Sequence, residues 1–175
     1  SILNIDFTDN FPRMTYSDAM KYYGSDKPDI RFDMRICELT ENVKGKDFVV
    51  FDSAEYIGAI CTEGCAEYTR KQLDELTNWV KRPQIGAKGL VYIKLGADGI
   101  KSSIDKFYTP DELKSIADKM GAKQGDLILI LAGDKKATIT GLGELRREMG
   151  KRMGLRDNSK FAPLLVVDFQ LFEYD

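Results

Sequence analysis

The sequence predicts an α+β fold: a two-layer sandwich in which helices cover one face of a mainly antiparallel or mixed sheet. Three observations support this prediction. Apolar runs typical of strands occur in hairpin-like pairs, amphipathic segments with clear helix starts separate them, and a chain of 175 residues with 43% hydrophobic content can bury a substantial core. The expected element order is β-β-α-β-α-β-α, within one domain with short additions.

The charge balance narrows the class of function. The formal net charge is −2 and the pI is near 5.4, so any contact with nucleic acid or membrane would have to be local. No apolar run is long enough to cross a bilayer and no charged-then-apolar leader opens the chain, so we expect a cytoplasmic protein without membrane contact. The chain starts at Ser1 and stops at Asp175 directly after an apolar run, which suggests a piece of a longer protein.

The sequence contains three cysteines and no histidine. The lack of histidine excludes Ser-His-Asp and Cys-His catalysis and histidine zinc ligands within this chain. Cys61 and Cys65 could supply half of a metal site, but Cys37 is the only remaining thiol. We therefore expect ordinary buried or half-buried thiols, no metal, and a reducing compartment.

The first structural signal lies in residues 14–34. Thr15 is a suitable N-cap with Asp18 as a capping-box-like partner, and Gly24 ends the predicted helix. A charged loop follows over residues 25–31, in which Pro28 favours an extended backbone before it.

Periodicity and capping residues predict the other elements. Thr69 and Thr109 begin two of the helices, the second with proline at its first position. A short helix over residues 37–43 is expected to precede a hairpin made by the first two strands, and residues 96–99 are interpreted as a plain turn. The predicted strands cover residues 48–51, 56–61, 90–95, 126–131 and 163–172. The predicted longer helices cover residues 70–82, 110–120 and 138–153.

The last of these helices carries the strongest basic patch of the chain. Its cations are assigned to the side opposite the apolar stripe, and they are Arg146, Arg147, Lys151 and Arg152. Glu144 and Glu148 precede them at the spacing of solvated ion pairs, so a solvated face and an RNA contact both remain open. From the residues alone, the chain is an α+β domain, either a binding module or a structural insert, without a recognisable active site.

Residues at both ends and throughout the chain resemble bacterial-type aspartyl-tRNA synthetase, of class II, just after its motif 2. The specific stretches are 11–16 (FPRMTY), 23–31 (YGSDKPDIR) and 166–169 (VVDF). The middle also resembles domains appended to amidotransferase subunits that act on misacylated tRNA.

This resemblance implies a division of the chain into three parts. Residues 1–36 would be a flank of the catalytic domain, 37–160 an inserted GAD-type domain, and 161–175 the returning flank. Since an insertion needs its two ends close together, we expect the flanks to meet in space. No catalytic, cofactor-binding or metal residue of the family falls within this chain.

The resemblance also implies partners. The intact enzyme would be a homodimeric aspartate–tRNA ligase that uses ATP and Mg²⁺ and binds tRNA(Asp), whereas this chain alone would be a monomer without cofactor or activity. The candidate tRNA contacts are Lys27, Arg31, Arg146 and Arg152. The alternatives are a non-catalytic tRNA-binding or regulatory module of an amidotransferase-type protein, and a structural spacer. Whether the enzyme also charges tRNA(Asn) stays open.

Overall fold

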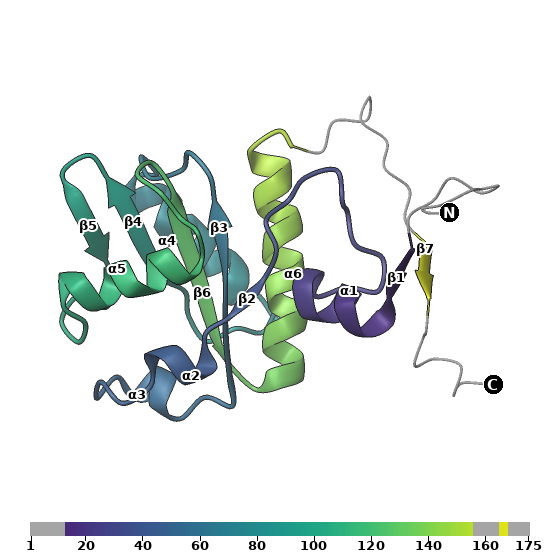
Figure 1. Ribbon diagram of the computed structural model, residues 1–175, viewed down its shortest axis with the longest axis horizontal. Coiled ribbons are helices and arrows are strands. Elements are labelled where there is room, and N and C mark those ends of the chain that lie inside the picture. The colour runs from purple at the N-terminus through teal and green to yellow at the C-terminus, as the bar shows by residue number, and fades with distance from the viewer. Residues whose placement is uncertain (1–12, 156–164, 168–175) are drawn as a thin grey trace.

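The computed structural model describes residues 13–155 and 165–167, which form a sheet covered by helices and a smaller unit beside it (Figure 1). The strands are β1 (Arg13–Thr15), β2 (Cys37–Glu38), β3 (Tyr56–Thr62), β4 (Val91–Gly96), β5 (Gly99–Ser102), β6 (Leu127–Gly133) and β7 (Leu165–Val167). The helices are α1 (Tyr16–Tyr23), α2 (Thr40–Val43), α3 (Val49–Asp52), α4 (Arg70–Val80), α5 (Pro110–Lys119) and α6 (Lys135–Arg152).

The main sheet has five strands in the order β2-β3-β6-β4-β5, and all of its neighbours are antiparallel. Strand β6 is central: Ile130 lies opposite Ala59 of β3 and opposite Val91 of β4. A central strand has neighbours on both edges, which fits the uninterrupted apolar run that begins at Leu127. The α+β class and the antiparallel sheet are therefore confirmed.

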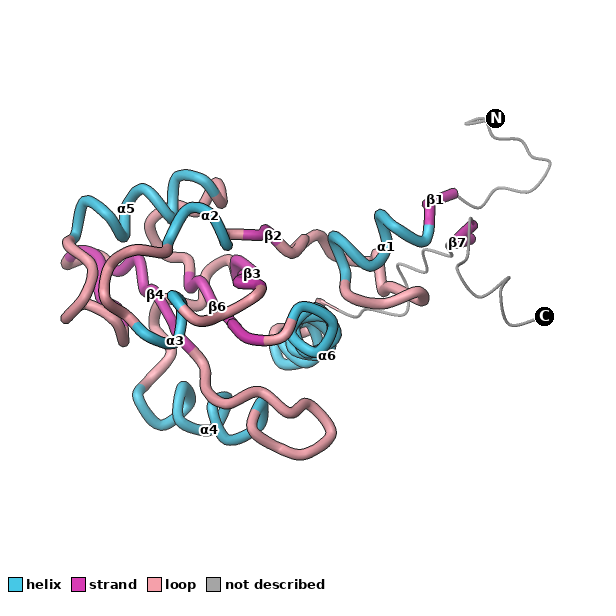
Figure 2. Tube along the Cα trace, turned by 90° about the horizontal axis from the view of Figure 1, so that it is seen from below, coloured by secondary structure: helices cyan, strands magenta, loops and turns pink. Residues whose placement is uncertain are grey.

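Helices cover both faces of this sheet, whereas the sequence predicted one helical layer (Figure 2). Along β6, Ile128 and Ile130 join a core cluster with residues of α2, α3 and α5. Leu127, Leu129 and Leu131 join a second cluster with residues of α4 and α6. Both faces of β6 are apolar, so each requires its own cover.

Local capping signals were reliable guides to the helix starts. Capping boxes are present at Thr69 and Thr109, each with the reciprocal bond from the residue three positions later. The Thr15 hydroxyl accepts a hydrogen bond from the Asp18 amide, and Gly24 ends α1 in the left-handed region with φ of 66°. Helix α6 begins earlier than predicted because Asp134 acts as its N-cap.

Two of the predicted elements are wrong. Residues 48–51 do not form a strand or a hairpin: α3 is a single turn, and the Phe48 ring packs against Phe51 and Phe107 with centroid distances of 4.8 and 5.0 Å. Residues 37–43 divide into β2 and α2 instead of one helix. The turn predicted at residues 96–99 is present, and it leads into β5, a strand that the apolar pattern did not predict.

The two flanks meet through a parallel pair of strands outside the main sheet. Strand β1 pairs with β7, and Met14 lies opposite Val166. This pairing agrees with the expectation that the flanks lie close together. The boundaries at residues 36/37 and 160/161 stay a prediction, and the rest of the predicted strand 163–172 lies outside the described residues.

No helix among residues 13–155 has both the length and the apolar character that crossing a bilayer would require.

Candidate functional site

Helix α6 lies between the main sheet and the flanking unit, and it contacts both β3 and α1 (Figure 1). We call residues 24–36, which lead from α1 to β2, the joint loop. We call the contact of α1 and this loop with α6 the joint. The joint brings together segments more than 100 positions apart in the sequence.

Arg146 of α6 is the polar centre of the joint. Its side chain is almost fully buried, at 1% relative exposure. Nε donates to the Met34 carbonyl at 2.9 Å, and the two terminal nitrogens donate to the carbonyls of Asp29 and Phe32, each at 2.8 Å. The guanidinium therefore binds three backbone acceptors of one loop, which its rigid fork of donors suits well.

Two aromatic rings stack on the same guanidinium. Its central carbon lies 4.5 Å from the ring centroid of Tyr23 and 4.3 Å from that of Phe32. Burial lowers the pKa of Arg146 to about 10, although Tyr23 and Asp29 act in the opposite direction. The group is still protonated at neutral pH, and the carbonyls and rings offset the loss of its hydration.

Glycines allow the joint to close tightly. A Cβ on Gly143 of α6 would lie 2.5 Å from the Gly24 carbonyl oxygen, and one on Gly24 would lie 2.4 Å from that of Ile139. A Cβ on Gly150 would lie 2.5 Å from the Phe32 ring. Gly143 and Gly150 flank Arg146 along one side of α6, so the loop can reach the guanidinium.

The joint loop has internal bonds of its own. Arg31 forms a two-pronged pair with Asp29, with Nη2 at 2.6 Å and Nε at 2.9 Å from the two carboxylate oxygens. The Ile36 amide donates to the Tyr22 carbonyl at 2.8 Å and closes the loop at its base. The loop is thus a shaped segment that Arg146 holds in place.

The structure changes the interpretation of the four candidate tRNA contacts. The prediction that Arg146 contacts tRNA is wrong, because its side chain lies inside the joint and cannot reach a polyanion at the surface. The sequence contained the signal, because position 146 is four after Leu142 and three before Met149 and so falls within the apolar stripe. Arg152 pairs with Glu148 at 2.7 Å, Arg31 pairs with Asp29, and Lys27 is exposed on the joint loop.

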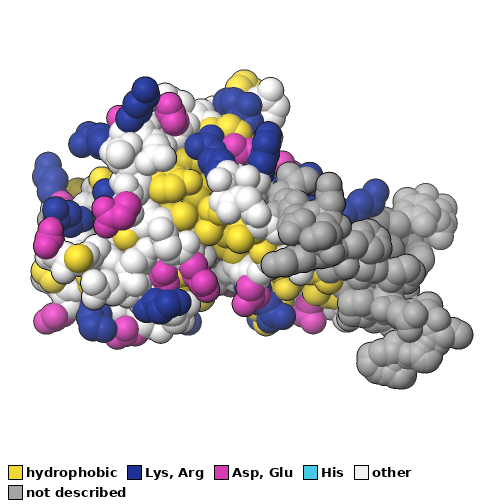
Figure 3. Space-filling view, turned by 90° about the horizontal axis from the view of Figure 1, so that it is seen from above, with side chains coloured by type: hydrophobic (Ala, Val, Ile, Leu, Met, Phe, Trp, Pro, Cys, Tyr) yellow, Lys and Arg dark blue, Asp and Glu magenta, His cyan; other side chains and the backbone are white. Residues whose placement is uncertain are grey.

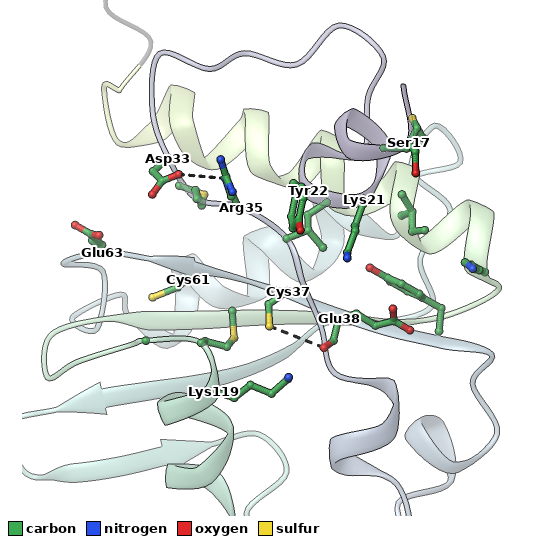
Figure 4. A pocket seen from close by; sticks show the side chains of 18 of the residues that line it. Ser17, Lys21, Tyr22, Asp33, Arg35, Cys37, Glu38, Cys61, Glu63 and Lys119 are labelled. Atoms are coloured by element: carbon green, nitrogen blue, oxygen red, sulfur yellow. Dashed lines mark hydrogen bonds and ion pairs between the residues drawn. The ribbon is translucent and has the colours of Figure 1, made fainter. Parts of the chain in front are cut away.

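A groove of about 920 Å³ lies beside the joint, between α1, β2 and the end of α5 (Figure 4). Lys21 of α1 and Lys119 of α5 approach it from opposite sides. Its charged lining consists of four cations, Lys21, Arg35, Lys119 and Lys135, and four carboxylates, Asp33, Glu38, Glu63 and Asp126. This balance gives the groove no net attraction for a polyanion.

Two cysteines line the same groove. Burial raises the pKa of Cys37, and it raises the pKa of Cys61 to about 12 together with the charge of Asp126, which accepts a hydrogen bond from the Cys61 thiol at 3.5 Å. Both thiols are protonated at neutral pH and are poor nucleophiles. On the face shown in Figure 3, acidic and basic side chains are interspersed, without a broad area of one sign.

The fold and the joint define a class of protein: an α+β domain with helices on both faces of its sheet, tied through one helix to a pair of flanking strands. Residues 49–142 match the GAD domain family, and the chain belongs to that family.

The chain is similar along nearly its whole length to bacterial aspartate–tRNA ligases. It is 58% identical to that of Azobacteroides pseudotrichonymphae over 94% of this chain, and 58% identical to that of Porphyromonas gingivalis over 100%. It is 60% identical to that of Bacteroides fragilis over 99%. The chain spans only 28 to 30% of the length of these relatives.

Proposed function

We propose that this chain is a segment of an aspartate–tRNA ligase, in which a GAD-type insert at about residues 37–160 stands between two short flanks of the catalytic domain. The observation that carries the proposal is the identity of 58 to 60% to such ligases over 94 to 100% of the chain. The whole enzyme would use ATP and Mg²⁺ to activate aspartate as an adenylate and would transfer the aspartyl group to tRNA(Asp). The same observation favours the ligase over an amidotransferase-type module.

The role proposed for the insert is to brace the catalytic domain or to lie beside the acceptor arm of the tRNA. The joint supports the bracing role because it fixes the domain to its flank through a buried cation and close glycine contacts. Catalysis would depend on parts of the ligase outside this chain.

An activity comparison tests the proposal. The full-length protein that contains this chain should support aspartate-dependent exchange of pyrophosphate into ATP and should charge tRNA(Asp). The 175-residue chain alone should support neither reaction. Pyrophosphate exchange by the isolated chain would contradict the proposal that catalysis depends on parts of the ligase outside this chain. A full-length protein that fails to activate aspartate would contradict the ligase assignment.

A salt-dependent tRNA titration of the full-length protein tests the surface contact. Lys27→Ala combined with Arg152→Ala should weaken binding and reduce the slope of log K against log salt by about 0.7 to 0.9 for each phosphate that the protein no longer neutralises. The control is Lys101→Ala with Lys106→Ala, which removes two exposed cations at the opposite edge of the sheet. Equal slopes in both double variants would show that Lys27 and Arg152 do not contact the tRNA. Arg31→Ala is assessed separately because Asp29, the carboxylate that it releases, belongs to the joint loop that Arg146 holds.

A further inference from the structure

We propose that Arg146 is a positioning residue: it sets the orientation of the GAD-type domain on its flank, and this orientation supports the transfer of the amino acid to tRNA. The effect on transfer to tRNA rests on the proposed ligase function. The orientation of the domain on its flank concerns this chain alone.

The acceptors of Arg146 are the first argument. All three are backbone carbonyls, and they belong to Asp29, Phe32 and Met34 of one short stretch. A carboxylate partner could follow the cation through side-chain rotation, but a carbonyl moves only with its peptide plane. Three such bonds to one planar group therefore define both the distance and the angle of the joint loop relative to α6.

The second argument is that α6 belongs to both sides of the joint. Leu142, Leu145 and Met149 of this helix are fully buried in the core cluster under the sheet. The side chain of Arg146 extends from the same helix to the joint loop. A rotation of the sheet domain therefore rotates the guanidinium, and the loop must follow or break its hydrogen bonds.

The third argument is the open space on the other side of the joint. The groove of about 920 Å³ is lined by Lys21 and Tyr22 of α1 and by Cys37, Tyr56 and Lys119 of the sheet domain. The flank and the domain are thus separated there rather than packed. Contact along α6 must supply the orientation. Gly143 brings two backbones close and Gly150 makes room for the Phe32 ring, which leaves the angular restraint to Arg146.

The experiment compares Arg146→Met and Arg146→Lys with Arg147→Met in the full-length ligase. Arg147 is the matched control because it is the next residue of α6, is half exposed, and lies 3.7 Å from Glu144 in an ordinary ion pair. In Arg146→Met we expect kcat/KM for tRNA charging to fall roughly 10- to 100-fold, the range known for small misplacements far from the chemistry. Aspartate-dependent pyrophosphate exchange should stay within about twofold, since activation does not involve the tRNA.

Arg146→Lys should behave like Arg146→Met, because lysine keeps the charge without the planar fork. An equal fall of charging and exchange, or full charging by both Arg146 variants, would overturn the positioning role.

Hydrogen exchange on the chain itself separates orientation from folding. In Arg146→Met the Ile36 amide, bonded to Tyr22 across the base of the joint loop, should exchange at least about tenfold faster. Amides in the β3–β6 ladder should keep their protection, as in Arg147→Met. Loss of ladder protection in both Arg146 variants would assign Arg146 to folding and overturn the inference. Because this measurement needs no activity, it stands even if the full-length protein proves not to be a ligase.

Discussion

Two buried ionic side chains, Arg146 and Asp126, are satisfied largely by the backbone. Asp126 is 2% exposed and accepts hydrogen bonds from the amides of Gly64 and Lys123, at 3.2 and 3.0 Å, and from the thiol of Cys61. Such bonds offset the desolvation of a buried carboxylate. Burial and the charge of Asp126 together raise the pKa of the neighbouring Cys61 thiol.

Cys61 should react very slowly with alkylating reagents. With its pKa raised to about 12, only about one thiol in ten thousand is ionised at pH 8. Iodoacetamide labelling, followed by peptide mass spectrometry, should show a rate that keeps rising about tenfold per pH unit from pH 7 to 10. A rate that levels off near pH 9 would contradict this prediction. Labelling in denaturant supplies the control for intrinsic reactivity.

Tyr108 should make the chain sensitive to alkali. Its hydroxyl donates to the Val43 carbonyl, and burial, aided by Asp52 and Glu112, raises its pKa to about 12. A raised tyrosine pKa favours the protonated folded form, so this stability is complete below pH 10 and is lost as the pH rises through 12. Tyr108→Phe should lower the unfolding free energy by about 1 kcal/mol at pH 7 and flatten the decline above pH 10 in urea titrations. Parallel pH profiles of the two proteins would contradict the assignment.

Elements with local signals were predictable, and elements that depend on distant partners were not. The starts of α4 and α5 follow from Thr69 and Thr109, whose capping partners lie three residues away. The run Phe48–Phe51 looked like a strand because its aromatic and β-branched residues favour one. The Phe48 ring instead packs on Phe107 and the Phe51 ring on Tyr108, both far along the chain, and the backbone turns to allow these contacts.

The contribution of the Thr109 cap to the free energy of unfolding should be measurable at α5. Thr109→Ala removes the acceptor for the Glu112 amide, so the unfolding free energy should fall by about 1 kcal/mol. Thr109→Ser keeps a hydroxyl and is the matched control, expected to lose much less. Urea titrations followed by circular dichroism give both values. Equal losses would mean that the threonine methyl group, rather than the cap, matters.

Two glycines of α6 offer a contrasting pair. A Cβ on Gly141 would meet Leu131 and Ile85 at 3.5 and 3.6 Å, which is ordinary contact, so Gly141→Ala should be neutral or stabilise the helix by up to about 1 kcal/mol. Gly143→Ala adds the same methyl group against the Gly24 backbone at 2.5 Å and should destabilise the joint by about 1 to 3 kcal/mol. Hydrogen exchange at Ile36 detects the second effect. The prediction is wrong if the two variants behave alike.

At the scale of the whole molecule, the sequence predicted the class of fold and the meeting of the flanks but not the joint. Arg146 reaches carbonyls more than 110 positions earlier in the chain, and no local pattern reveals such a pairing. Helical spacing did place Arg146 within the apolar stripe, but its charge favoured an assignment to the surface. Helices on both faces of the sheet likewise could not be predicted from the apolar residues of β6 alone. That prediction requires knowing which two strands lie beside β6.

The arrangement of the two cores predicts that the insert folds without its first flank. Every buried residue of both clusters lies at Ile36 or later, so a chain of residues 36–160 keeps them all. This chain should unfold cooperatively and should retain slow hydrogen exchange in the β3–β6 ladder. It lacks the carbonyls that bind Arg146, so the guanidinium becomes free to reach water. Arg146→Met should therefore change its unfolding free energy by less than about 0.5 kcal/mol, as for an ordinary surface position. A large loss in the shortened chain would show that Arg146 supports the sheet domain itself, and an uncooperative transition would move the predicted boundary into the flank.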